Sequence, residues 1–147
     1  MSDAGTTFRL IYTSHSRIPA DSRGTVLAQI FDVSRSNNKK SGVTGALLIT
    51  DHYFVQALEG DESTVNALYG RICDDTRHEQ VSVVESGAVE SRVFSRWSMA
   101  QVSRSGHADI PLHDVDGRIH PAARRTLSAD QSALLTRMRN VIGADTV

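Results

Sequence analysis

Apolar residues that form short runs or alternate with polar ones predict five β-strands, at residues 8–14, 43–50, 53–58, 81–85 and 97–102. Successive side chains of a strand point to opposite faces, so Tyr12 shares a face with Leu10 while Ile11 lies on the other. The second strand is almost wholly apolar, which is typical of a strand buried on both faces. Asp51 and His52 form the turn after it, so we expect the second and third strands to pair as a hairpin.

Apolar residues at helical spacing predict three helices. The first begins at Asp21 or Ser22, either of which can cap it, and ends near residue 35. Asp61 caps the second helix, which ends near residues 74–75. A capping box formed by Ser128 and Gln131 opens the third helix. This last helix, at residues 129–142, carries an apolar stripe of Leu134, Leu135, Met138, Val141 and Ile142.

The order of these elements predicts the fold class α+β, a ferredoxin-like βαββαβ sandwich with an added fifth strand and a C-terminal helix. Right-handed crossovers place the first two helices on one face of the sheet. The first and third strands of this topology are neighbours, so we expect Tyr12 and Gln56 on adjacent strands and on the helix-covered face. The stripe of the last helix needs cover, and we expect it to dock on the opposite face.

The same pattern divides the chain into four segments. Residues 1–7 are polar and are expected to be disordered, and residues 8–102 form the folded domain. A segment with two prolines, three histidines and little periodicity follows, and we interpret it as a connector at residues 103–127. The C-terminal helix occupies residues 128–143, if its capping residues are counted.

Composition narrows the class of protein. The 147 residues carry a net charge of −1 without a basic patch, so no nucleic-acid partner is indicated. The single cysteine, Cys73, excludes an internal disulfide and fits a reducing compartment. No apolar run approaches the roughly 18 residues that a membrane helix needs, and the N-terminus lacks a signal core. We therefore expect a cytoplasmic protein.

One polar residue stands inside the apolar hairpin. Gln56 lies between Val55 and Ala57, in a strand that the pattern places in the core. A buried primary amide costs about 1–3 kcal/mol when it is left unpaired. Gln56 is therefore either paired with a neighbour in the sheet or faces a polar ligand held against it, and the strand alone does not choose between these two interpretations.

Several kinds of reactive site are not indicated. His107, His113 and His120 are scattered through the connector without the spacing of a zinc site, so we expect no metal. Cys73 precedes two aspartates, which would raise the pKa of a thiol rather than activate it. The glycines at Gly42 and Gly45 lack the Lys-Ser that follows them in a phosphate-binding loop.

Six residues from separate elements form a set whose polar members could nevertheless converge between the first two helices. Ile30 and Ile72 would cover the two faces of a flat ring there, and amides would meet its edge. Each residue also has an ordinary role as a core, capping or anchoring side chain. The set consists of Tyr12, Asn37, Asn38, Gln56, Trp97 and Met99.

Over about residues 8–101 the chain resembles the BLUF family, sensors of blue light using FAD. The resemblance rests on several separated motifs in one order. They are LIYTS around Tyr12, the pair Asn37-Asn38, GVTGALL running into FVQALEG around Gln56, DDTRH from Asp74 to His78, and RVFSRWSM ending at Met99.

The resemblance implies noncovalent FAD, with its ring between the two helices. Asn38, with Asn37, would bond the pyrimidine edge, and Gln56 would reach N5 or the C4 carbonyl. Tyr12 would donate an electron and a proton in blue light, which leaves Gln56 rotated or tautomerised and shifts the absorption to the red. Trp97 and Met99 would relay the signal. Residues that match family positions near the ring or ribityl chain are Ser34, Arg71, Asp75 and His78.

The implied function is that of a photoreceptor without its own effector enzyme, which signals to a partner protein and forms a homo-oligomer, a dimer or larger. Two alternatives share the fold. An acylphosphatase-like hydrolase would need an anion-binding loop after the first strand, for which residues 14–17 are a loose candidate. A ligand-free interaction module would use the last helix for dimerisation and would leave Tyr12 and Gln56 unexplained.

Overall fold

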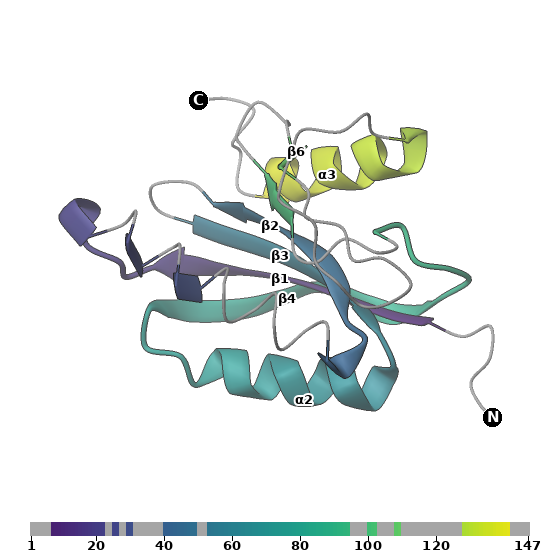
Figure 1. Ribbon diagram of the computed structural model, residues 1–147, viewed down its shortest axis with the longest axis horizontal. Coiled ribbons are helices and arrows are strands. Elements are labelled where there is room, and N and C mark those ends of the chain that lie inside the picture. Colours follow the sequence, from purple (N-terminus) through teal and green to yellow (C-terminus); the bar gives the residue numbers. More distant parts are fainter. Residues whose placement is uncertain are drawn as a thin grey trace.

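In the computed structural model a twisted sheet separates two helices (Figure 1). The structure describes residues 7–22, 25–26, 29–30, 40–49, 53–94, 100–102, 108–109 and 128–141. The sheet has the strand order β4-β1-β3-β2-β5-β6. Its strands are β1 (Thr7–Ser16), β2 (Thr44–Ile49), β3 (Tyr53–Gly60), β4 (His78–Val89), β5 (Ala100–Val102) and β6 (Ala108–Asp109). The helices are the 3-10 turn η1 (Ala20–Ser22), α2 (Glu62–Cys73) and α3 (Ala129–Val141).

Strands β4, β1, β3 and β2 form the antiparallel four-stranded sheet of a ferredoxin-type fold. This part of the predicted fold class is confirmed. Strand β3 returns from β2 as a hairpin and pairs on its other side with β1. Tyr12 and Gln56 lie on adjacent strands, as the topology predicted, and the register places them directly opposite each other.

The edges of the sheet differ from the prediction. Strand β4 covers twelve residues, whereas the sequence predicted only residues 81–85. The extra length follows from main-chain pairing with β1, which continues through Ser86 and Gly87 although these residues show no apolar alternation. Beyond β2 the sheet continues with β5, parallel to β2, and with β6, which falls inside the predicted connector. Residues 97–99 of the predicted fifth strand lie outside the described residues.

Helix α2 begins as predicted. The Asp61 carboxylate accepts a hydrogen bond from the backbone N–H of Thr64 at 3.4 Å, which satisfies one of the free donors of the first turn. The helix ends at Cys73, slightly before the predicted residues 74–75. Most of the predicted first helix lies outside the described residues, but residues 25–26 and 29–30 are helical.

The sheet has an apolar core on each face. On the α2 face, Leu10, Tyr12 and Leu58 pack in a buried cluster, and Ile30 and Ile72 pack against it. On the other face the buried cluster contains Ile11, Ala46, Leu48, Val55, Ala57, Phe94, Leu134, Leu135 and Met138. Figure 1 shows α3 lying over this second face.

The predicted docking of the last helix on the open sheet face is therefore confirmed for three stripe residues. Leu134, Leu135 and Met138 are buried. Val141, at the end of α3, is 39% exposed and so is less well covered than these three residues. Ile142, the fifth predicted member of the stripe, lies outside the described residues.

Candidate functional site

A buried hydrogen bond joins the centres of β1 and β3. The Tyr12 hydroxyl donates to the side-chain oxygen of Gln56, and the two residues are only 3% and 5% exposed. Both lie on the α2 face because each follows the alternation of its strand. The question left open by the sequence is answered in part: the Gln56 oxygen has a partner in the sheet, and that partner is Tyr12.

The surroundings of Tyr12 keep its phenol protonated. Burial raises the pKa of Tyr12 far above its ordinary value near 10, and the negative charge of Asp75 adds to the effect. The ring of Tyr69, from α2, lies 5.7 Å away between centroids, and the ring of His78 lies 6.2 Å away. Tyr12 therefore keeps a hydrogen-bonding proton aimed at Gln56.

His78, at the start of β4, is held at both ring nitrogens. Its Nε2 lies 2.7 Å from the carbonyl oxygen of Ile72, which can only accept, so Nε2 carries a proton. Its Nδ1 lies 2.7 Å from the hydroxyl of Ser14, which donates to it when the ring is neutral. His78 thus connects β1 to the last turn of α2 through hydrogen bonds, which hold its ring in place beside Tyr12.

Asp75, in the loop after α2, is paired within its own turn. Its carboxylate accepts hydrogen bonds from the backbone N–H and the Nε of Arg77, each at 2.9 Å. The side-chain bond to Arg77 lowers the pKa of Asp75 below its usual value, although partial burial opposes this. The anionic carboxylate adds negative charge near Tyr12. Arg71, one turn earlier, is exposed.

The structure brings some of the predicted site residues together on one face of the sheet. Tyr12 and Gln56 form the floor, and Ile30 and Ile72 pack against the same cluster from two helical segments. Asp75 and His78 stand at the C-terminal end of α2. The predicted residues that lie outside the described part of the chain are Ser34, Asn37, Asn38, Trp97 and Met99.

Three further residues shape the region, and the sequence does not assign them to a flavin site. Tyr69 belongs to α2, and Ser14 is predicted only as the end of a strand and as part of the loose anion-loop candidate at residues 14–17. Glu59 is fully buried, and a second polar residue in the largely apolar strand that carries Gln56 is the signal that could have revealed it. A charged residue at such a position requires partners on its own face of the sheet.

A family model described as "BLUF: Sensors of blue-light using FAD" matches residues 7–100. The chain belongs to the BLUF family. This assignment favours the flavin-binding interpretation over an acylphosphatase-like hydrolase or a ligand-free module. The family binds FAD, and the predicted cofactor is confirmed at that level.

Relatives of known type include light-regulated enzymes and a regulator. The chain is 34% identical over 135 residues to the photoactivated adenylate cyclase subunit alpha of Euglena gracilis, which covers 91% of this chain but 13% of that protein. It is 32% identical to the blue light- and temperature-regulated antirepressor BluF of Escherichia coli (strain K12) over 73% of this chain and 25% of that protein. The chain therefore spans only a small part of these relatives.

Solved structures of small BLUF proteins share the fold. The dark-state structure of BlrB superposes with a TM-score of 0.63 at 35% identity, over 69% of this chain and 75% of that one. The photo-activated state of BlsA gives a TM-score of 0.64 at 30% identity, over 66% and 69% of the two chains.

The described residues fit a flavin ring chemically. A phenol and an amide are hydrogen-bonded on the α2 face of the sheet, and Ile30 and Ile72 pack against the apolar cluster that contains the phenol. Such a floor offers hydrogen bonds to the edge of a flat heteroaromatic ring and apolar contact to its faces. In the described part of the chain, no group of three or more His, Cys, Asp or Glu residues could bind a metal ion. None of the helices described here has the length and apolarity to cross a membrane.

Proposed function

We propose that Tyr12 and Gln56 form the photochemical switch of this blue-light sensor. Bound FAD supplies the chromophore and, when excited, the electron acceptor. Tyr12 gives up an electron together with its phenolic proton and then regains both. Gln56 is left rotated or tautomerised, which changes its hydrogen bonds and shifts the absorption to the red.

The observation that carries this proposal is the hydrogen bond from Tyr12 to Gln56. Because burial raises the pKa of Tyr12, the phenol keeps its proton until it loses an electron. An oxidised phenol is a strong acid, so its proton moves to the nearest acceptor. The acceptor that receives the Tyr12 hydrogen bond is the Gln56 oxygen, and protonation there is the first step toward a different amide orientation or tautomer.

The cofactor would be held by the remaining predicted residues. Asn37 and Asn38 would bond the polar edge of the ring, and Ile30 and Ile72 would cover its faces. Support comes from the packing of both isoleucines against the cluster that contains Tyr12. Ser34 and Arg71 would bind toward the ribityl chain. Asp75 and His78 would act mainly by shaping the site, since Arg77, Ser14 and Ile72 bind their polar atoms.

The output would pass through the segment with Trp97 and Met99, which leads into β5, to α3, and from there to a partner protein. Support comes from the position of β5 beside β2 and from the docking of α3 on the sheet. The relative from Escherichia coli is named a blue light- and temperature-regulated antirepressor. We propose in addition that the domain forms a dimer or larger homo-oligomer on the α3 face.

The decisive experiment is an absorption spectrum of the purified, FAD-loaded chain before and after blue light. Wild-type protein should show a reversible red shift. Tyr12→Phe and Gln56→Leu should bind flavin but lose the shift, because each deletes one end of the hydrogen bond. Tyr69→Phe is the matched control, since it removes a hydroxyl from the ring next to Tyr12 and should keep the shift. A normal red shift in Tyr12→Phe would show that the electron donor is misassigned. A wild-type protein that is colourless and does not bind added FAD would contradict flavin binding.

A further inference from the structure

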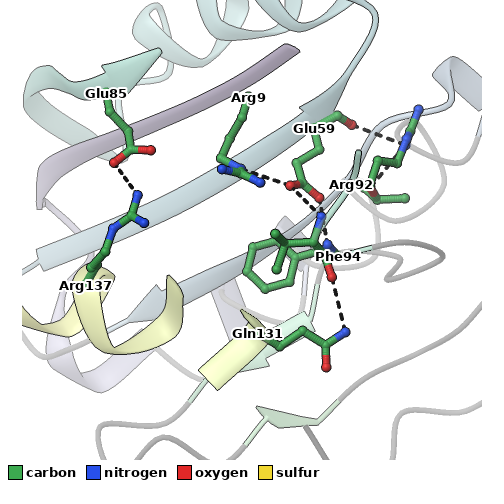
Figure 2. A network of polar contacts seen from close by, with 9 residues as sticks. Arg9, Glu59, Glu85, Arg92, Phe94, Gln131 and Arg137 are labelled. Carbon is green, nitrogen blue, oxygen red and sulfur yellow. Dashed lines mark hydrogen bonds and ion pairs between the residues drawn. The ribbon is translucent and has the colours of Figure 1, made fainter. Parts of the chain in front are cut away.

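A second polar centre lies on the opposite face of β3, three residues after Gln56. The Glu59 carboxylate is fully buried and accepts three hydrogen bonds (Figure 2). Arg9 Nε donates to Oε2 at 3.0 Å, and the backbone N–H groups of Val93 and Phe94 donate at 2.9 and 2.7 Å. Arg92 adds a contact to the Glu59 carbonyl oxygen at 3.3 Å. One strand residue therefore fixes the position of the whole segment at residues 92–94.

The same segment is bonded to the beginning of α3. The side-chain nitrogen of Gln131 donates to the carbonyl oxygen of Val93 at 3.2 Å (Figure 2). The side-chain oxygen of Gln131 accepts from the backbone N–H of Ser128 at 2.9 Å, which completes the capping box. Val93 is thus bound through its N–H to Glu59 and through its C=O to the first turn of α3.

We propose that Glu59 is a positioning residue that transmits a displacement of β3 to α3, along a path from Glu59 through Val93 to Gln131. We call this path the Glu59 link. It rests on the proposed function, because a light-driven change at Gln56 is what would displace the strand. Gln56 and Glu59 share β3, so a shift of its backbone moves both side chains.

The Glu59 link is better suited to this task than the other contacts of α3. The ion pair between Arg137 and Glu85 is largely exposed, with side chains 56% and 41% accessible, and such pairs bind weakly. The apolar contacts of Leu135 and Met138 have no direction and tolerate sliding. The bonds to Glu59 are directional and buried, so a moving carboxylate must carry residues 93–94 with it or leave their N–H groups unpaired.

The test uses two variants at the start of α3 in the FAD-loaded full chain. Gln131→Glu keeps the capping oxygen for Ser128 but replaces the donor to Val93 by an oxygen, so it cuts the link and preserves the cap. Ser128→Ala is the matched control, because it weakens the cap and leaves the donor to Val93 in place. Amide hydrogen exchange of α3 is measured in the dark and in blue light, together with the red shift.

In wild-type protein we expect light to speed the exchange of α3 by about two- to ten-fold, the factor that corresponds to one lost hydrogen bond. In Gln131→Glu the amides of α3 should exchange at the faster rate already in the dark, and light should not change this rate, while the red shift remains. Ser128→Ala should keep both the light-dependent exchange of α3 and the red shift. Glu59→Gln, which retains one acceptor but no charge, should behave as Gln131→Glu does if it folds.

Three results would overturn the proposal. The first is a red shift in wild-type protein without any light-dependent exchange of α3. The second is a light-dependent exchange of α3 in Gln131→Glu that equals that of wild-type protein. The third is the loss of light-dependent exchange in both Gln131→Glu and Ser128→Ala, which would assign the effect to the start of the helix and not to the Glu59 link. A wild-type chain without a red shift would refute the proposed function, and this inference would fall with it.

Discussion

Strands β1 and β3 place one polar pair on each face of the sheet, and the two pairs are built differently. On the α2 face Tyr12 lies opposite Gln56, and on the α3 face Arg9 lies opposite Glu59. The first pair is neutral and is joined by a single hydroxyl-to-amide bond. The second is charged, and its carboxylate also holds two backbone N–H groups.

This difference separates a contact that can rearrange from one that anchors. A neutral hydrogen bond contributes about 0.5–1.5 kcal/mol net to stability. Exchanging it for another hydrogen bond between the same groups therefore changes the free energy of unfolding only slightly. Removing one partner of a buried ion pair costs about 3–5 kcal/mol, because the other charge is left buried. The same two strands therefore combine a switchable centre on one face with a rigid one on the other.

The largest effect is expected from Glu59→Ala. It leaves Arg9 and the N–H groups of Val93 and Phe94 without their acceptor, and should lower the free energy of unfolding by about 3–5 kcal/mol. Urea denaturation measures the loss. Glu85→Ala is the control, because its ion pair with Arg137 is exposed and should cost no more than about 1 kcal/mol. Equal losses in the two variants would show that Glu59 is not an anchor.

Next in size is Met138→Ala on the same face. Met138 is buried between α3 and the sheet, and its truncation should lower the free energy of unfolding by about 2–5 kcal/mol. Val141→Ala is the control at the exposed end of α3 and should change stability by less than about 0.5 kcal/mol. The flavin spectrum should stay unchanged in both variants. A spectral change in Met138→Ala would contradict the separation of the two faces.

A smaller effect on stability is expected from Tyr12→Phe. The ring and its packing remain, and only the hydrogen bond to Gln56 is lost, so the free energy of unfolding should fall by about 0.5–1.5 kcal/mol at neutral pH. Denaturation of the flavin-free protein measures this term without a contribution from cofactor binding. A loss as large as that of Glu59→Ala would contradict the contrast between a switchable pair and an anchor.

The smallest effect is a dependence of stability on alkaline pH. Burial raises the folded pKa of Tyr12 above its unfolded value near 10, so the protonated phenol contributes stability that is complete below pH 10. This contribution is lost as the pH rises from there through the folded pKa. Partial burial and a hydrogen bond with Cys73 raise the pKa of Tyr69 to about 12 in the same direction. Denaturation midpoints between pH 9 and about 11 should therefore fall more steeply in wild-type protein than in Tyr12→Phe, and parallel curves would contradict this.

Local patterns in the sequence were sufficient for the parts of the structure that neighbouring residues decide. Alternation placed Tyr12 and Gln56 on one face and Ile11 on the other, as the two clusters show. The capping residues Asp61 and Ser128 were also recognisable, because a cap is a contact with a backbone group three residues away.

Edges and short strands were not predictable in this way. The extension of β4 through Gly87 and the two-residue strand β6 depend on main-chain bonds to another strand, which leave no apolar pattern behind. The contacts of His78 were not predictable from its motif either. The motif associates His78 with the cofactor, and its two nitrogens contact Ser14 and the carbonyl oxygen of Ile72.

The sequence by itself determined which residues face which side of the central strands, where α2 and α3 begin, and which family the chain resembles. Only the tertiary structure decided that Glu59 anchors the segment before β5 and that Gln131 connects this segment to α3. These contacts join residues 35 and 38 positions apart in the chain. A charged residue in a buried strand shows from the sequence that it needs partners. Which residues become its partners depends on how distant segments pack against the sheet.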